Sequence, residues 1–230
     1  MLHQQNINIA VDAVVIAYKN RELYILLIQQ KYGVFKDFWS LPGGFVIEGE
    51  TLSEAVKREL KEEAGITVNY MEQLYTFGDN VNRDPRGQVI SVAYFALVNP
   101  SRFNLNASTD AKDARWFSIR EMPQLAYDHT GIIKKALDRL KTKLLYQPIG
   151  FDLLNSEFAF SDLENLYKSI LGKDIDRRNF RKKMMSFNIL LETGKIQKIG
   201  SGRPAKMFKF NKRKYQQLEK RGFHFEIKFA

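Results

Sequence analysis

Acidic side chains gather at helical spacing in one short stretch of the chain. Residues 41–66, LPGGFVIEGETLSEAVKRELKEEAGI, contain six glutamates, two lysines and one arginine. On an α-helix, Glu59, Glu62 and Glu63 stand at positions i, i+3 and i+4, so their carboxylates share one face. Like charges this close destabilise a helix, and a hard divalent cation with oxygen ligands relieves the repulsion. Taken alone, KRELKEE reads either as a solvated helix face with compensating lysines or as a cation site.

The elements that must position these carboxylates are indicated by caps and apolar periodicity. Thr51 and Glu54 are spaced as a capping box, and Gly65 stands where a left-handed residue ends a helix. The apolar stripe of this helix, which should pack on a sheet, is Leu52, Val56, Leu60 and Ala64. Further elements are expected as strands at 8–18, 23–29, 88–98 and around 114–117, and as a closing helix from about 130 to 145. This order predicts an α/β layered domain.

Charge is distributed unevenly on either side of the segment YQPIGF (146–151), where a proline and a glycine should end the closing helix. We expect two domains, 1–147 and 148–230. The first holds 18 basic and 17 acidic residues, and the second holds 18 basic and 9 acidic residues. The second domain should therefore meet an anionic partner. We favour nucleic acid over a membrane, because no long amphipathic lipid-seeking helix accompanies the charge.

The C-terminal part has the spacing of a winged helix-turn-helix. One helix is expected over 161–171, with Ser161 and Glu164 as its capping box, and Asp176 should cap a second helix, RRNFRKKMMSF. A strand, a glycine-rich turn and a strand then predict a wing. The candidate DNA contacts are Arg177, Arg178, Asn179, Arg181, Lys182, Lys183, Arg203 and Lys206. The alternative is a small helical domain with a solubilising basic face.

Other candidate ligand contacts stand outside the acidic stretch. In NRDPRG (82–87), Arg83 and Arg86 are either phosphate or ribose contacts or surface arginines on a turn at Asp84-Pro85. Asp128 and His129 precede the closing helix, where Asp128 is a ligand contact or a helix cap and His129 is a ligand contact or structural. Four aromatic residues either stack on a base or belong to the core: Trp39, Phe45, Tyr75 and Phe77.

The chain contains no cysteine, and it begins without a basic region followed by an apolar stretch. Disulfides and thiolate metal sites are therefore excluded, and a signal peptide is not expected. No apolar run approaches the roughly 18 residues of a membrane span. We expect a soluble, cytoplasmic protein that does not bind membranes.

The acidic stretch resembles the Nudix box in every fixed position: Gly44, Glu50, Arg58, Glu59, Leu60, Glu62, Glu63, Gly65 and Ile66. The resemblance implies a Nudix α/β/α sandwich that holds Mg²⁺ or Mn²⁺ against a diphosphate. It implies Glu62, Glu63 and the carbonyl of Gly43 as metal ligands, and Glu59 as a ligand or general base. It implies that Arg58 and Glu50 pair to orient the helix. The catalytic residues implied are therefore Glu59, Arg58 and Glu50. Substrates of the family are nucleoside diphosphates linked to another moiety.

The whole chain resembles the Nudix-related transcriptional regulators of the NrtR type. The segments that carry this resemblance are the box, RDPRG before a strand, YDH, QPIGF and the RNFRKK helix. It implies a homodimer that senses ADP-ribose in NAD metabolism and binds a palindromic operator on double-stranded DNA through paired winged helices. Because some relatives are assigned to sugars such as arabinose, an arabinose-type sensor without catalysis stays open. Because the box is complete, a second alternative also stays open. This alternative is a Mg²⁺-dependent pyrophosphatase that converts ADP-ribose to AMP and ribose 5-phosphate and carries an accessory winged helix.

Overall fold

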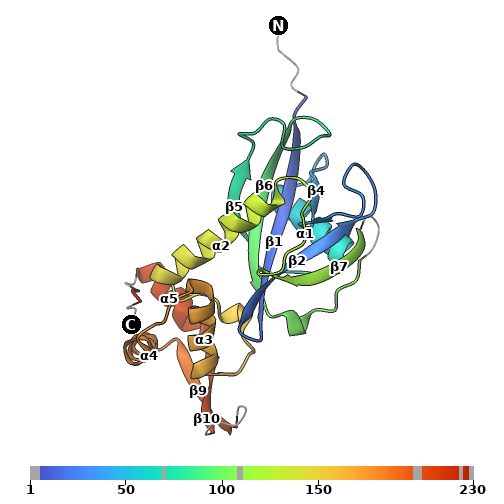
Figure 1. Ribbon diagram of the computed structural model, residues 1–230. Helices are drawn as coiled ribbons and strands as arrows, with labels where there is room; N and C mark the ends of the chain where they lie inside the picture. The colour runs from blue at the N-terminus through green and yellow to red at the C-terminus, as the bar shows by residue number, and fades with distance from the viewer. Residues whose placement is uncertain (1–5, 69–70, 108–110, 199–203, 223–224, 228–230) are drawn as a thin grey trace. The chain divides into compact units, whose positions relative to one another are not determined.

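The computed structural model describes residues 6–68, 71–107, 111–198, 204–222 and 225–227 (Figure 1). The chain divides into two compact units. One comprises Met1–Lys19 and Leu23–Asp138, and the other comprises Asn20–Glu22 and Arg139–Ala230. The division falls inside helix α2 (His129–Tyr146). Among the described residues, no helix is long and apolar enough to cross a membrane.

The first unit is built on a mixed sheet. Its strands are β1 (Asn8–Lys19), β2 (Glu22–Gln30), β3 (Trp39–Ser40), β4 (Gly43–Phe45), β5 (Glu72–Phe77), β6 (Val89–Val98) and β7 (Ala111–Ser118). The order is β3-β2-β1-β6-β5, with β4 also paired to β1 and β7 to β2. β1 runs parallel to β6 and antiparallel to β4, in a register that sets Asp12 opposite Gly43. The central strand thus lies directly beside the loop that begins the acidic stretch.

The longer strands match their predicted positions, and the shorter ones were missed. The predicted strands at 8–18, 23–29, 88–98 and 114–117 are confirmed as β1, β2, β6 and β7. Asn20 and Arg21 have φ angles of 52° and 63°, the mirror-image turn that suits a tight hairpin. β3 and β4 span only two and three residues, and such short strands leave no periodic signal.

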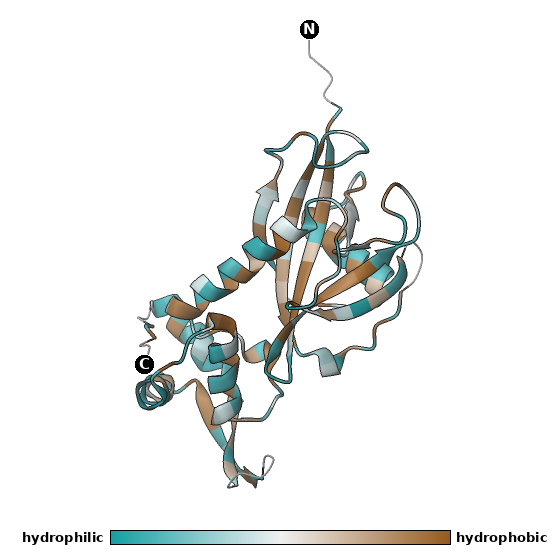
Figure 2. Ribbon diagram, in the orientation of Figure 1, coloured by the Kyte–Doolittle hydropathy of each residue, from teal (hydrophilic) through white to brown (hydrophobic). Residues whose placement is uncertain are grey.

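Helices cover both faces of this sheet (Figure 1). α1 (Leu52–Ala64) buries Val56 and Leu60 against alternate residues of β1, including Val11 and Ala13, and the central strands are largely hydrophobic (Figure 2). Asp12, which lies between Val11 and Ala13, points to the opposite face, where it meets His129 at the start of α2. This layering confirms the predicted α/β/α sandwich.

Local signals set both ends of α1. Thr51 Oγ1 accepts the N–H of Glu54 at 3.3 Å, and Glu54 Oε2 accepts the N–H of Thr51 at 2.9 Å. Gly65 ends the helix with φ 69°, and its N–H donates to the carbonyls of Leu60 and Lys61. The predicted capping box and C-terminal glycine are confirmed.

The second unit contains a helix-turn-helix followed by an antiparallel pair of strands. Its elements are β8 (Phe158–Ala159), α3 (Phe160–Leu171), α4 (Arg177–Ser186), β9 (Leu190–Gln197), β10 (Ala205–Phe210) and α5 (Lys212–Arg221). The sheet order is β8-β10-β9. Aromatic rings fill its core, with Tyr167 4.8 Å from Phe180 between ring centroids. The expected helix-turn-helix and its wing strands are confirmed, whereas β8 and α5 were not predicted.

The predicted cap of α3 is wrong. The helix begins one residue earlier, directly after β8, and the N–H of Ala159 donates to Asp162 at 2.9 Å. Because Ser161 is already inside the helix, it cannot serve as the N-cap. Glu164 is buried instead and pairs with basic side chains. The predicted cap of α4 is confirmed, since Asp176 Oδ1 accepts the N–H of Asn179 at 3.0 Å.

Candidate functional site

Arg58 is the centre of a hydrogen-bonded cluster that joins α1 to the loop before it. Its Nε and Nη2 donate to the two carboxylate oxygens of Glu50 at 2.8 and 3.0 Å, and Nη2 also donates to the carbonyl of Phe45 at 3.1 Å. Its Nη1 donates to Glu59 at 2.7 Å and to Glu62 at 3.2 Å. The hydrogen bond to Glu50, with those to the other carboxylates, raises the pKa of Arg58 further, so the guanidinium stays charged. One side chain thereby fixes the loop and three carboxylates.

Glu59 is a buried carboxylate in close contact with the loop. It is 9% exposed, and burial raises its pKa, although Arg58 acts in the opposite direction. A Cβ on Gly44 would lie 2.2 Å from Glu59 Oε1. A Cβ at this position would therefore displace the Glu59 carboxylate from the loop. A carboxylate with raised proton affinity, held beside a glycine loop, is suited to accept a proton from water.

Gly43 and Glu63 make a second close contact between loop and helix. The N–H of Gly43 donates to Glu63 Oε2 at 2.8 Å. A Cβ on Gly43 would lie 2.2 Å from the carbonyl oxygen of Val11 in β1. The glycine pair is therefore pressed between the central strand and the acidic face of α1.

The carboxylates share a face but do not converge as they are placed. Within the described ranges, no group of three or more Asp, Glu or His side chains is arranged to hold a metal ion. Glu59 and Glu62 are turned toward Arg58, and Glu62 is the more exposed of the two. All the nearby donors are oxygens, the set that Mg²⁺ and Mn²⁺ prefer. A cation would have to draw Glu59 and Glu62 away from Arg58.

Asp12 was missed by the sequence reasoning, although it organises the other side of the loop. It accepts a hydrogen bond from Ser91 Oγ, lies 3.3 Å from His129 Nε2 and lies 3.9 Å from Arg83 Nη2. Burial acts to raise the pKa of Asp12, but His129, Ser91 and Arg83 together lower it below its ordinary value. His129 Nδ1 accepts the N–H of Leu41 at 2.9 Å, so the proton of the neutral ring is on Nε2. The sequence does contain one signal that could have identified Asp12: it is a lone carboxylate inside the apolar strand VDAVVIA, and charged residues are rarely buried without a partner.

Arg83 and Asp128 form an internal ion pair. The Arg83 side chain is 4% exposed, and its Nε donates to Asp128 Oδ2 at 2.9 Å while Nη2 contacts Oδ1. The reading of Arg83 as a surface arginine is therefore wrong. The carbonyl of Asp128 accepts the N–H of Gly131 in the first turn of α2, but its carboxylate pairs with Arg83 rather than capping the helix.

Arg86 is partly open to solvent on an aromatic platform. Its guanidinium donates to Asp84 at 2.7 Å and lies 4.4 Å from the ring centre of Phe45 and 5.1 Å from that of Tyr127. The predicted turn is present, since the N–H of Gly87 donates to the carbonyl of Asp84. Planar cationic and aromatic surfaces of this kind stack well on a nucleobase.

The other aromatic candidates have packing partners of their own. The rings of Trp39 and Phe117 are 4.5 Å apart between centroids, and those of Tyr75 and Phe77 in β5 are 5.3 Å apart. Of the four predicted aromatics, the structure brings Phe45 to the arginine platform.

In the second unit, α4 buries Phe180 and Met184. Two arginines of α4 contact other residues of the winged helix domain. Arg177 Nε lies 3.0 Å from Glu164 Oε2, and the Arg181 guanidinium lies 4.7 Å from the ring centre of Phe160. These contacts favour a structural contribution from both residues.

The remaining candidate DNA contacts differ in exposure and in whether they contact other side chains of the protein. Arg178 and Lys182 are exposed and take part in no ion pair within the part of the chain that the structure describes. The other side chains have partners: Asn179 donates to Asp176 at 2.6 Å, Lys183 lies 5.4 Å from the ring centre of Phe187, and Lys206 lies 3.0 Å from Glu192. Arg203 lies outside the described residues. The surface of α4 is thus basic, with Arg178 and Lys182 as its least engaged charges.

Comparison with known proteins agrees with this fold and site. Residues 7–140 match the family model of the NUDIX domain, and residues 150–210 match that of the NrtR DNA-binding winged helix domain. The class is therefore a Nudix protein with a DNA-binding winged helix.

Individual relatives narrow the class. The chain is 33% identical over 204 residues to the ADPR responsive transcriptional repressor NtrR of Acinetobacter baylyi, covering 87% of this chain and 80% of the relative. It is 41% identical over 126 residues to the ADP-ribose pyrophosphatase of Methanocaldococcus jannaschii, covering 55% and 70%.

Solved structures extend the likeness. Shewanella oneidensis NrtR complexed with a 27mer DNA superposes with a TM-score of 0.78 at 30% identity, over 95% of this chain and 98% of that chain. Its NUDIX domain complexed with ADP ribose gives a TM-score of 0.55 at 35% identity, over 60% and 90%. The chain belongs to the Nudix family, in its NrtR group of winged helix members.

Proposed function

We propose that this chain is an ADP-ribose-responsive transcriptional regulator that binds operator DNA through its winged helix domain and the effector through its Nudix domain. The observation that carries the proposal is similarity along most of the chain to a repressor of this type, with both domains in the same order. Likeness to structures containing DNA and ADP ribose supports both partners.

We assign the effector contacts to the Arg86 platform and the adjoining acidic helix. Arg86, with Phe45 and Tyr127, offers a stacking surface for a base or a cationic contact for a phosphate. Arg83, Asp128 and His129 act indirectly, because their polar atoms are engaged within the protein. Their buried hydrogen bonds hold the walls of the site in place.

A divalent metal is a general feature of the Nudix family. We propose Mg²⁺ or Mn²⁺ here, held by Glu62, Glu63, Glu59 and the carbonyl of Gly43. Such a cation neutralises diphosphate oxygens and lowers the pKa of a bound water. Arg58 and Glu50 hold α1 against the loop, and we assign Glu59, whose pKa is raised by burial, as the general base.

Hydrolysis of ADP-ribose is the second candidate function. The complete Nudix box and the likeness to an ADP-ribose pyrophosphatase favour it. Cleavage to AMP and ribose 5-phosphate would also end the signal, so hydrolysis and regulation are compatible. An arabinose-type effector remains the alternative ligand.

The likeness to NrtR-type regulators also supports proposals about assembly, domain boundary and location. We propose a homodimer on a palindromic operator, a boundary near residue 147 between the domains, and a cytoplasmic location. Duplex DNA binding by paired domains requires two half-sites whose spacing matches the dimer.

The experiment that tests the regulator is DNA binding by the full chain, measured by fluorescence anisotropy on the duplex upstream of its own coding sequence. We expect ADP-ribose to change the Kd for this duplex, and an equal concentration of arabinose to leave it unchanged. Arg178→Ala should weaken DNA binding and reduce its salt dependence by about one unit of slope, since one phosphate contact is lost.

Two results would contradict the proposal. One is a wild-type chain that does not bind the duplex. The other is DNA binding that is insensitive to ADP-ribose but responds to arabinose, which would identify a sugar sensor instead.

A further inference from the structure

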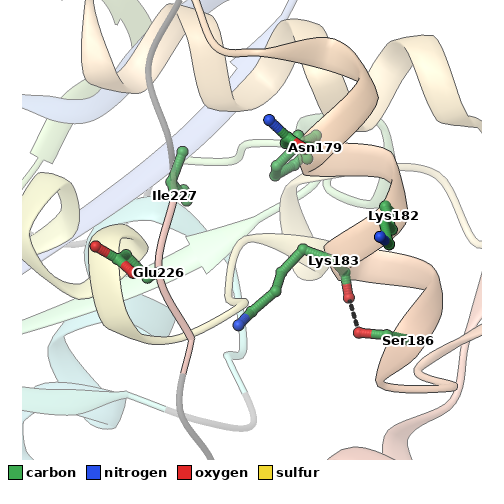
Figure 3. Close-up of a pocket in the computed structure, with 7 residues that line it drawn as sticks. Asn179, Lys182, Lys183, Ser186, Glu226 and Ile227 are labelled. Carbon is green, nitrogen blue, oxygen red and sulfur yellow. Dashed lines mark hydrogen bonds between the residues drawn. The ribbon is translucent and has the colours of Figure 1, made fainter.

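A groove of about 230 Å³ lies beside α4 within the second unit (Figure 3). One of its walls consists of α4 residues, and the other belongs to the segment 225–227, which lies beyond the residues that match the winged helix family. Three of the α4 residues that line the groove are candidate DNA contacts: Asn179, Lys182 and Lys183. The segment therefore borders the helix that is proposed to meet DNA.

Two buried apolar side chains attach this segment to α4. Phe225 is 3% exposed and Ile227 is 7% exposed. The ring centre of Phe225 lies 5.8 Å from that of Phe187, the residue that caps the carboxyl end of α4. Ile227 lines the groove together with Asn179 and Lys183, which lie further toward the amino end of the helix. The segment thus contacts α4 at two levels along its length.

The helix itself has few anchors in the core. Of its ten residues only Phe180 and Met184 are buried, and five are basic. A helix this short depends on tertiary packing for its stability. Because the two buried residues stand at i and i+4, they attach α4 along a single line, and other contacts must restrain rotation about that line. The ion pair of Arg177 with Glu164 acts at the amino end, and Phe225 supplies a restraint at the carboxyl end.

Lys183 connects the segment with the basic surface of α4. It is half-buried, and its Nζ lies 5.4 Å from the ring centre of Phe187, the same ring that Phe225 contacts. Figure 3 shows the side chain of Lys183 extending from the helix toward the segment. A shift of the Phe187 ring would therefore change both the end of α4 and the place of this charge.

We propose that Phe225 and Ile227 are positioning residues for DNA recognition, which hold α4 in the orientation that lets its side chains reach base edges. The inference rests on the proposed DNA binding. Contacts to base edges require side chains placed within about 0.5 Å and 10–20°, whereas long, flexible lysine and arginine side chains can follow a phosphate when the helix rotates slightly. Affinity for random DNA comes almost entirely from phosphate contacts, and an operator adds base contacts. Loss of the segment's anchors should therefore lower the preference for an operator rather than the affinity for DNA in general.

The test measures the Kd of the full chain for two duplexes of equal length by fluorescence anisotropy. One duplex is the sequence upstream of the protein's own coding sequence, and the other is of random sequence. The variants are Phe225→Ala and Ile227→Ala, and the second provides the same comparison where the first does not fold. Leu153→Ala is the matched control, because Leu153 is a buried aliphatic residue of η2 (Phe151–Leu153) in the same unit and does not line the groove. Urea unfolding measures the stability that each variant loses.

We expect each of the two variants to bind the upstream duplex about tenfold more weakly, the size of one lost base contact. Binding to the random duplex should stay within about twofold of wild type, with the same salt slope, because the phosphate contacts remain. Leu153→Ala should keep the wild-type ratio of the two Kd values even where it lowers stability. Phe225→Leu, which retains an apolar side chain at the anchor, should keep most of the preference for the upstream duplex.

Four results would overturn the inference. An unchanged ratio of the two Kd values in Phe225→Ala and Ile227→Ala would show that the segment does not position α4 for recognition. Equal weakening on both duplexes would show a loss of folded protein instead. A lowered ratio in Leu153→Ala would show that any loss of core packing in this unit has the same effect. A wild type that binds the two duplexes equally, or binds neither, would overturn the proposed function, and with it this inference.

Discussion

Two polar clusters, one partly buried and one buried, hold opposite sides of the loop that contains Gly43 and Gly44. On one side Arg58 joins Glu50, and on the other Asp12 faces His129, whose ring accepts the N–H of Leu41. The glycines lie between these clusters: a Cβ on Gly43 would clash with the backbone of Val11, and one on Gly44 would displace the carboxylate of Glu59. The position of the loop is therefore determined by side chains that need not touch the ligand.

At the residue scale, Asp12→Asn should destabilise the chain by about 3 kcal/mol at neutral pH, because the buried carboxylate that pairs with Arg83 and accepts from Ser91 and His129 loses its charge. The pKa of Asp12 is lowered in the folded state from its ordinary value of 3.8, so its contribution is present above that value and is lost as the pH falls through the folded pKa. The deficit of the variant should therefore shrink below about pH 4.

Urea unfolding of both proteins across this pH range measures the difference. Asp79→Asn, at an exposed position, is the control and should match wild type. A deficit of constant size at every pH would show that the charge of Asp12 is not the cause.

At the scale of elements, Glu164 connects the two helices of the helix-turn-helix. Its buried carboxylate lies 3.2 Å from Lys168 in α3 and 3.0 Å from Arg177 in α4. The residue predicted as part of a cap is thus a brace between helices. Its two partners approach from solvent, which moderates the strength of each pair.

Glu164→Gln should destabilise the second unit by about 1 kcal/mol and weaken DNA binding, because α4 loses a restraint. ADP-ribose affinity should be unchanged. Chemical unfolding measures the stability, fluorescence anisotropy measures DNA binding, and calorimetry measures ADP-ribose affinity. Glu157→Gln, which removes an exposed pair with Lys195, is the control and should change stability by less than about 0.5 kcal/mol. Equal effects of the two substitutions would refute the brace.

At the scale of the whole molecule, the two candidate activities belong to separate units of the chain. Glu62→Gln should reduce Mg²⁺-dependent turnover of ADP-ribose by at least about a hundredfold, because a metal ligand loses its charge. DNA affinity should stay within about twofold of wild type, well under 1 kcal/mol. Product formation and anisotropy on the same preparation provide the measurements.

Glu48→Gln supplies the matched control, since Glu48 is an exposed glutamate in the same stretch but outside the fixed positions of the box. It should leave turnover intact. Loss of both activities in Glu62→Gln would contradict the separation of the modules. A wild type that binds ADP-ribose without turning it over would leave the Nudix domain as a sensor alone.

The sequence by itself determined the features that depend on neighbours along the chain. The caps of α1 at Thr51 and Gly65 and the cap of α4 at Asp176 follow from residues three or four positions apart. The spacing of the Nudix box and the basic excess after residue 147 are also properties of the chain alone. Such signals are readable because their geometry is set by the local backbone.

Only the tertiary structure decided which polar groups meet across the fold. Asp12 and His129, or Arg83 and Asp128, are brought together by packing of distant elements, and no local pattern encodes those pairs. Packing likewise turned Glu164 from a predicted cap into a brace between α3 and α4. The physical reason is that a buried charge takes whatever partner the completed core supplies, because leaving it unpaired costs several kcal/mol.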